Sequence, residues 1–229
     1  MAAQSRRPYL SDRALLCFHE RTRRDIVNRL QERIVQDGVV LSPTVLKVDA
    51  FLNHQVDPEL VMDIGAAMAA PHRDAGVTKV LTVEASGIPL AMATALALGG
   101  IPFVYAKKKR AITQGDAVWT APAYSFTRQE SYHVSLSKAY LGSEDVVLMV
   151  DDILAEGSAL TALTEIVHQA GARVVGAVVA VEKRFQSGRE KLAQMGVQVR
   201  ALAGIESMSA NGITFAQDDE SRTPEVMLP

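Results

Sequence analysis

The chain has 229 residues, of which 48% are hydrophobic and 22% charged, and its formal net charge at pH 7 is −2. This composition fits one large domain with an ordinary apolar core, and the near-neutral charge argues against nucleic acid as a partner. Cys17 is the only cysteine and no apolar stretch reaches the ~20 residues that span a bilayer, so we expect a cytoplasmic protein without disulfides or membrane contact.

Two helices and two short strands are predicted in the first third of the chain. Residues 1–24 are rich in arginine and lack periodicity, which predicts a flexible extension. Apolar residues recur every fourth position over 25–36 and predict an amphipathic helix that ends at Gly38. Pro58 suits the first turn of a second helix, which we expect to end near Arg73. The predicted strands between these helices are 39–41 and 45–48.

From residue 77 onwards, apolar runs alternate with helical stretches that end at glycines. This alternation predicts parallel βαβ units, and therefore an α/β fold with a mostly parallel sheet flanked by helices. We expect one domain over 25–217, followed by a polar tail over 218–229. The predicted strands are 77–83, 101–106, 146–150, 173–181 and 197–202, and the predicted helices are 89–98, 158–170 and 188–195.

The segment 111–141 interrupts this alternation. It is polar and turn-rich, with strand-like pieces around Tyr124 and His133. A long excursion inside a compact domain is usually functional or mobile. We predict a flexible antiparallel hairpin that covers a site.

The stretch 146–160 carries the strongest chemical signal. An apolar run ends in Asp151 and Asp152, and a loop of small residues then leads into a helix. In an open parallel sheet, ligands bind beyond the carboxyl ends of the strands. Neighbouring residues there point in different directions, so the two carboxylates can reach a cis-diol or a metal-bound ligand. The loop offers backbone N–H groups to an anion, Gly157 permits a tight turn, and Ser158 is a candidate helix cap. The arrangement predicts a site for a sugar that carries a phosphate.

The same stretch resembles the phosphoribosyl diphosphate (PRPP) signature of the type I phosphoribosyltransferases. This resemblance implies that Asp151 and Asp152 are the catalytic acids that hold the ribose hydroxyls. Two residues depart from the usual loop, because Glu156 stands where a small or hydroxyl residue is common and Ala159 where threonine is common. Glu156 therefore has to point away from the phosphate. The implied 5′-phosphate loop consists of Ala155, Glu156, Gly157, Ser158 and Ala159.

A wider resemblance, over about 34–215, is to the bacterial xanthine phosphoribosyltransferases. It rests on linked blocks that include 38–42, 45–49, 84–88 and 182–189. It implies a type I phosphoribosyltransferase fold with a small hood formed by 38–56 and 203–216. The resemblance implies that the strand-to-helix loop 84–87, with Ser86 and Gly87, binds the pyrophosphate of PRPP. Lys107 and Lys109, in the basic run 107–110, are also implied to contact PRPP. Leu46, Asn53, Lys183 and Phe185 are implied to bind the purine.

The resemblance further implies a pentosyltransferase of purine salvage, which converts xanthine and PRPP to xanthosine 5′-monophosphate and pyrophosphate. Mg²⁺ is expected to bind through PRPP rather than through a dedicated protein cluster, and a homodimer is expected. One alternative is a transferase for hypoxanthine, guanine or adenine. The other is a PRPP-sensing transcriptional regulator, for which the arginine-rich segment before Asp25 is too short to form a winged helix.

Overall fold

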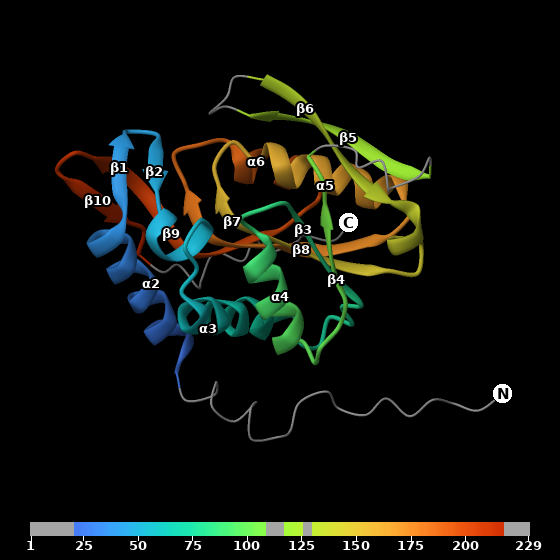
Figure 1. The fold of residues 1–229 in the computed structure, drawn as a ribbon, viewed down its shortest axis with the longest axis horizontal. Coiled ribbons are helices and arrows are strands. Elements are labelled where there is room, and N and C mark those ends of the chain that lie inside the picture. Colours follow the sequence, from blue (N-terminus) through green and yellow to red (C-terminus); the bar gives the residue numbers. More distant parts are fainter. Residues whose placement is uncertain (1–20, 109–116, 126–129, 218–229) are drawn as a thin grey trace, which may run out of the picture.

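The alternation of apolar runs and helices builds one six-stranded sheet, which crosses the middle of the computed structural model (Figure 1). The structure describes residues 21–108, 117–125 and 130–217. The strand order is β10-β9-β8-β7-β3-β4, and every pair is parallel except β10 with β9. This confirms the predicted α/β class. The strands are β3 (Lys79–Val83), β4 (Phe103–Ala106), β7 (Val146–Leu154), β8 (Arg173–Lys183), β9 (Val199–Ser209) and β10 (Gly212–Phe215).

Helices cover both faces of this sheet (Figure 1). Alternate residues of β7 enter two separate cores: Leu148 and Val150 lie in one, and Val147 and Met149 lie in the other. A strand that is buried on both faces is apolar throughout, which explains the uninterrupted run in the sequence. The first core is covered by α2 (Arg23–Asp37), α3 (Pro58–Ala69) and α4 (Ile88–Ala97), and the second by α5 (Ser158–Gln169) and α6 (Gly188–Gln194).

The two segments predicted to form the hood pack together at one end of the sheet. A hairpin of β1 (Val39–Ser42) and β2 (Val45–Lys47) leads into a short helical turn, η1 (Asp49–Asn53). Leu46 and Phe51 share an apolar cluster with Ile205 of β9. The boundaries of the hood stay a prediction.

A strand is present where 197–202 was predicted, but its bounds differ and it is not the last strand. The strand begins at Val199 and continues to Ser209, and β10 then pairs with it in antiparallel orientation. Gly204 and Glu206 interrupt the apolar run, so the sequence pattern ends before the strand does. The added length lets β9 extend from the sheet into the hood.

The expected hairpin within 111–141 is present. β5 (Val118–Ser125) pairs with β6 (Glu130–Ser137) in antiparallel orientation. The side chain of Gln169 at the end of α5 donates to the carbonyl of Thr120 at 2.9 Å, and the Trp119 indole donates to the carbonyl of Leu141 at 3.2 Å. The hairpin therefore lies along α5. Its predicted flexibility involves 109–116 and 126–129, which lie outside the described residues.

The first helix starts earlier than predicted. Asp25 and Thr22 form a capping box, in which the Asp25 N–H donates to the Thr22 hydroxyl at 3.2 Å and the Thr22 N–H donates to the Asp25 carboxylate at 3.0 Å. Arg21 also pairs with Asp63 on α3. Residues 21–24 are thus part of the folded structure, whereas the predicted extension over 1–20 and tail over 218–229 lie outside the described residues.

Candidate active site

The two aspartates lie inside β7 rather than after it. We predicted that the strand ends at Val150, but its pairing with β8 continues through Asp151 to Leu154. Both carboxylates are buried, at 8% and 7% exposure for Asp151 and Asp152. The predicted divergence of their side chains is observed, since successive strand residues face opposite sides. Asp151 faces Gly87 and Tyr132, whereas Asp152 faces Asn53 and Lys183.

Burial raises the pKa of the Asp151 carboxyl well above its usual range, and the charge of Asp152 raises it further. The Asp152 N–H donates to Asp151 Oδ1 at 3.0 Å, and the positive charge of Lys108 acts in the opposite direction. Two buried carboxylates side by side are costly to ionise together. The pair therefore favours a ligand that supplies hydroxyl donors or a cation.

Asp152 contacts one residue predicted to bind the purine, Asn53, and its charge acts on another, Lys183. The Asn53 side-chain amide donates to Asp152 Oδ2 at 3.1 Å, although 99 positions separate the two residues in the sequence. Burial lowers the pKa of the Lys183 ammonium, and the charge of Asp152 partly opposes this. Lys183 Nζ donates to the carbonyl of Thr44 in the β1–β2 turn at 2.7 Å. Thr44 had no signal in the sequence, because its contribution is a backbone carbonyl.

The other two predicted purine contacts differ from each other in exposure. The Leu46 side chain is buried in the apolar cluster that joins the hood to the sheet. Phe185 follows β8 and is 40% exposed, so its ring is accessible for stacking. Of the four predicted residues, Asn53 is therefore the one with a hydrogen bond to an aspartate, and Lys183 interacts with Asp152 through its charge.

The loop predicted to bind pyrophosphate packs directly against Asp151. Gly87 precedes the first residue of α4, and a Cβ atom there would overlap the Thr82 hydroxyl and lie 3.1 Å from Asp151 Oδ1. Gly87 is thus closely packed against the protein, and its contact with PRPP stays a prediction. Ser86 is partly exposed beside it, and the Glu84 carboxylate accepts a hydrogen bond from the Lys108 N–H at 2.7 Å.

The basic run after β4 reaches this region through Lys108. Its ammonium lies 5.9 Å from the centre of the Tyr132 ring, and burial together with the charge of Asp151 raises the pKa of that tyrosine. Lys107 pairs through its backbone with Ser135 of β6, at 2.8 and 2.9 Å. Lys109 lies outside the described residues. Lys108 and Tyr132 were missed as individual residues, and the signal for Lys108 was its place in the basic run.

The predicted 5′-phosphate loop turns at Gly157, which adopts a left-handed φ of +77°. The expectation that Ser158 caps α5 is wrong, because Gly157 occupies the capping position. Ser158 is instead the first helical residue, and its hydroxyl accepts a hydrogen bond from the Tyr124 N–H of the hairpin at 2.6 Å. Ala159 packs against the second core. The Glu156 side chain points to α6, where it meets Ser187 and Lys191.

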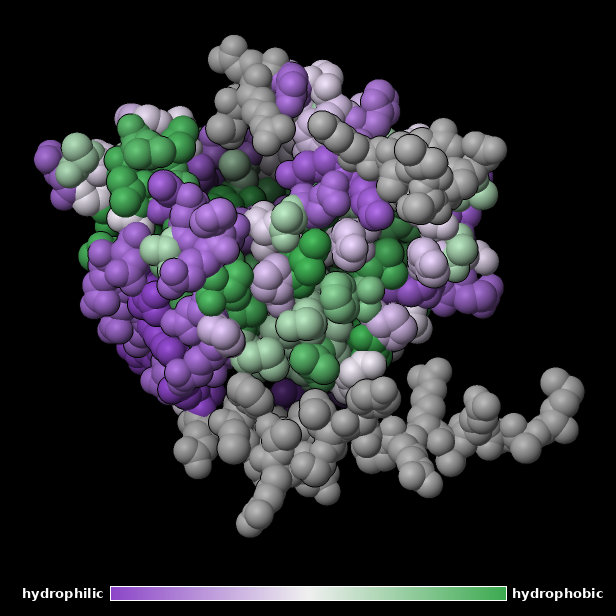
Figure 2. All heavy atoms as spheres, in the orientation of Figure 1, coloured by the Kyte–Doolittle hydropathy of each residue, from purple (hydrophilic) through white to green (hydrophobic). Residues whose placement is uncertain are grey.

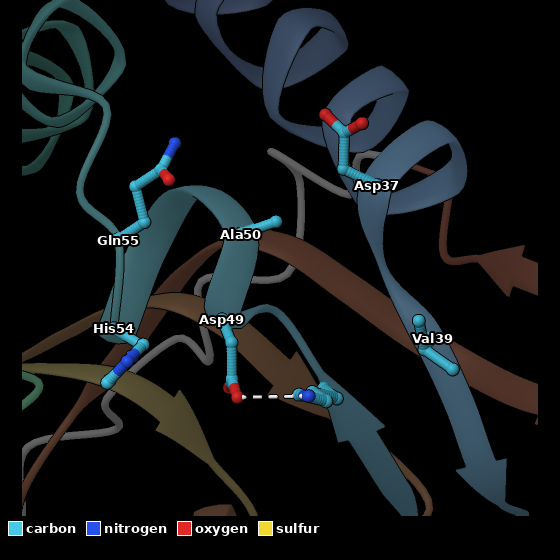
Figure 3. A pocket seen from close by; sticks show the side chains of 7 residues that line it. Asp37, Val39, Asp49, Ala50, His54 and Gln55 are labelled. Carbon is cyan, nitrogen blue, oxygen red and sulfur yellow. Dashed lines mark ion pairs between the residues drawn. The ribbon is translucent and has the colours of Figure 1, made fainter.

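A separate pocket of about 350 Å³ lies between the end of α2 and η1 (Figure 3). Its polar lining includes Lys47 and Asp49, which form an ion pair at 3.4 Å. None of the residues predicted to bind PRPP or xanthine lines this pocket. Within the described ranges, no cluster of three or more His, Cys, Asp or Glu residues is arranged to hold a metal ion.

Residues 53–199, which contain both aspartates and both predicted loops, match the phosphoribosyl transferase domain. The chain belongs to the phosphoribosyl transferase family. In the part of the chain that the structure describes, no helix of this family member is long and apolar enough to cross a membrane.

Its relatives confirm the wider resemblance. The xanthine phosphoribosyltransferase of Brevibacillus brevis is 57% identical over 196 residues, which are 86% of this chain and all of the relative. That of Heliobacterium modesticaldum is 49% identical over 83% of this chain and all of the relative. The solved adenine phosphoribosyltransferase of Giardia lamblia has a TM-score of 0.65 at 23% identity, and covers 80% of this chain and 98% of its own. It supports the type I phosphoribosyltransferase fold alone.

Proposed function

We propose that this phosphoribosyltransferase transfers the phosphoribosyl group of PRPP to xanthine in purine salvage. A ring nitrogen of xanthine forms a bond to the anomeric carbon, the bond from that carbon to pyrophosphate breaks, and the base loses its N–H proton. The products are xanthosine 5′-monophosphate and pyrophosphate. The observation that carries the proposal is the hydrogen bond from Asn53, a candidate base-binding residue, to the candidate ribose acid Asp152 at 3.1 Å. The charge of Asp152 also acts on Lys183, a second candidate base-binding residue. Relatives that carry the name xanthine phosphoribosyltransferase support the choice of base.

The proposed mechanism is one of positioning and electrostatics. Asp151 and Asp152 accept hydrogen bonds from the ribose hydroxyls, and their negative charge stabilises the positive character that the ring develops. The backbone N–H groups of 155–159 bind the 5′-phosphate. The leaving pyrophosphate lies against Ser86 and Gly87, and the basic residues Lys107 and Lys109 balance its charge. Lys108 is the described member of that run whose charge acts on Asp151.

The purine is held from the opposite side. Lys183 has three N–H donors, of which one bonds Thr44, so others remain for an oxygen or an anionic ring of xanthine. The Asn53 amide both donates and accepts, which suits a dioxopurine edge. Phe185 stacks on the ring, and Leu46 shapes the hood beside it.

Mg²⁺ is proposed as the cofactor. The donor set fits, because carboxylate oxygens are ligands that Mg²⁺ accepts while it keeps several waters and binds substrate phosphates. When bound, Mg²⁺ would neutralise charge on the pyrophosphate group. Mg²⁺ would bind through PRPP, whose ribose hydroxyls Asp151 and Asp152 would hold.

A homodimer in the cytoplasm is proposed as the working state. Met92 on α4 is 45% exposed and Tyr105 on the edge strand β4 is 40% exposed. The α4 sequence carries no charge, and Figure 2 shows apolar surface over this helix. A helix that is apolar on all sides is usually buried on all sides, so the exposed side of α4 suits contact with a second subunit. The single cysteine supports a reducing compartment.

A panel of purine bases with PRPP and Mg²⁺ tests the function. We expect nucleotide formation with xanthine at a kcat/KM well above that with guanine, hypoxanthine or adenine. A clear preference for another base would refute the choice of xanthine. If no base is used, and PRPP-sensitive binding to an operator is lost on removal of 1–24, the regulator alternative replaces the enzyme.

A further inference from the structure

The residue that departs from the usual phosphate loop, Glu156, has specific partners on α6. Its carboxylate accepts hydrogen bonds from the Lys191 ammonium at 2.9 Å and from the Ser187 hydroxyl. The same ammonium donates to the backbone carbonyl of Glu156 at 3.1 Å. These contacts hold the pKa of the Glu156 carboxyl below its usual value, first through Ser187 and then through Lys191, although partial burial opposes them. The carboxylate is therefore ionised and paired on the α6 side of the loop.

The backbones of the loop and of α6 also touch. The Gly188 N–H donates to the carbonyl of Ala155 at 3.0 Å. A Cβ atom on Gly157 would lie 2.9 Å from the Gly188 Cα atom, and a Cβ atom on Gly188 would overlap the Ala155 carbonyl. Neither position has space for a side chain. The loop 155–157 thus packs directly against the backbone at the start of α6.

This contact decides which way the peptide groups of the loop point. In a trans peptide the C=O of one residue and the N–H of the next point in opposite directions. The carbonyls of Ala155 and Glu156 both bond to α6, so the N–H groups of Glu156 and Gly157 point away from α6. The first N–H groups of α5 have no partner inside their own helix. The N–H groups of Glu156 and Gly157, together with those at the start of α5, are therefore available to a bound anion.

The start of α6 is itself anchored to the sheet. The Arg189 guanidinium binds the buried Glu182 carboxylate with two hydrogen bonds, at 2.6 and 2.5 Å. It also donates to the carbonyl of Val199 on β9 at 2.7 Å. A bidentate pair with one partner at 2% exposure is far more rigid than a surface ion pair. Glu182 directly precedes Lys183 on β8, so the anchor ends beside the candidate purine site.

We propose that Glu156 is a positioning residue that, with Lys191 and Ser187, locks the phosphate loop against α6 and so pre-sets its N–H groups for the 5′-phosphate of PRPP. This inference rests on the proposed function. It also accounts for an acid in a phosphate-binding loop, since the charge is neutralised by Lys191 and held on the far side of the backbone. Without the carboxylate, the 155–157 peptides gain freedom and the loop loses its preformed shape, which weakens phosphate binding but not base binding.

The test compares Glu156→Ala, Lys191→Met and the double variant with the unmodified protein. We expect the KM for PRPP to rise on the order of tenfold in each single variant, equivalent to about one hydrogen bond to a charged group. The KM for xanthine should stay within about twofold. The double variant should be little worse than either single one, because both changes remove the same interaction. Glu156→Gln keeps an acceptor for both partners and should recover much of the loss.

A second readout separates this inference from the proposed function. Amide hydrogen exchange of 155–159 in the free protein should become faster in Glu156→Ala and stay unchanged in Glu190→Ala, which removes an exposed carboxylate from the same helix. This readout needs no catalytic activity, so it stands even if the unmodified protein forms no nucleotide. Unchanged exchange together with an unchanged KM for PRPP would overturn the inference. So would equal rises in the KM for PRPP and for xanthine, which would indicate a general structural role.

Discussion

Replacement of Asp151 by asparagine should stabilise the free protein and weaken its binding of PRPP. The buried carboxylate has a raised pKa, caused first by burial and then by the charge of Asp152. A raised pKa means that the fold disfavours the ionised form, so at neutral pH this charge costs stability. Asparagine has nearly the same shape and keeps the oxygen that accepts from the Asp152 N–H at 3.0 Å, but it carries no charge.

The expected gain is about 1–2 kcal/mol, the range common for single stabilising substitutions. For a chain of this length that gain corresponds to a rise in Tm of about 2–8 °C. The gain depends on pH in a defined direction. Above the raised pKa of the folded state, Asp151 is ionised and the variant shows its whole gain in stability. The gain shrinks as the pH falls toward about 4, because Asp151 is then neutral in the unmodified protein as well.

Thermal unfolding at pH 7.5 and at pH 5, with and without PRPP and Mg²⁺, measures both effects. Asp145→Asn is the matched control. Burial would raise the pKa of Asp145, but Lys79 at 2.8 Å and the Gly142 N–H at 3.0 Å hold it below its usual value. This variant should therefore lower the Tm, and PRPP should still stabilise it. An Asp151→Asn variant that melts at or below the unmodified protein at pH 7.5, or whose advantage does not change with pH, would refute the reasoning.

Three further variants test other parts of the structure. Gly87→Ala should lower the free energy of unfolding, measured in urea, by about 1–3 kcal/mol, because the added methyl group overlaps the Thr82 hydroxyl. Thr82→Ala in the same chain should restore part of this stability, and an unchanged free energy of unfolding in Gly87→Ala would contradict the close packing. His72 is buried with no described partner for Nε2, and burial lowers its pKa, so stability should fall as the pH drops below about 6.5. His72→Phe should reduce this fall in Tm, and curves of Tm against pH that run parallel in the two proteins would contradict the prediction. Lys183→Met should raise the KM for xanthine on the order of tenfold while PRPP affinity is kept, and equal effects on both substrates would contradict a role in base binding.

The central strands were predictable because their physics is local. β7 is buried on both faces, so its sequence is apolar without interruption, and adjacent acids at its end stand out against that background. The end of the strand was not predictable, since the ladder with β8 continues through Asp151 and Asp152 despite their charge. The same applies to β9, where pairing with β10 decides the length and the apolar pattern does not.

The partners of the site residues were harder to predict than the residues themselves. Glu156 was recognisable as a departure from the usual loop, but nothing in the sequence indicates that Lys191, 35 positions later, is its partner. Ser158 has the composition of a helix cap, yet its hydroxyl is taken by a hairpin N–H from 34 positions earlier. Contacts of this kind depend on how separate elements pack, and one sequence does not report that packing.

The hood is attached to the sheet through the candidate site itself. Asn53 at the end of η1 bonds Asp152 on β7, and the β1–β2 turn bonds Lys183 on β8 through the carbonyl of Thr44. In the proposed function, the ribose would bind Asp152 next to Asn53, and the purine would bind Lys183 next to the carbonyl of Thr44. Both substrates would therefore bind beside the hydrogen bonds that hold the hood to the sheet.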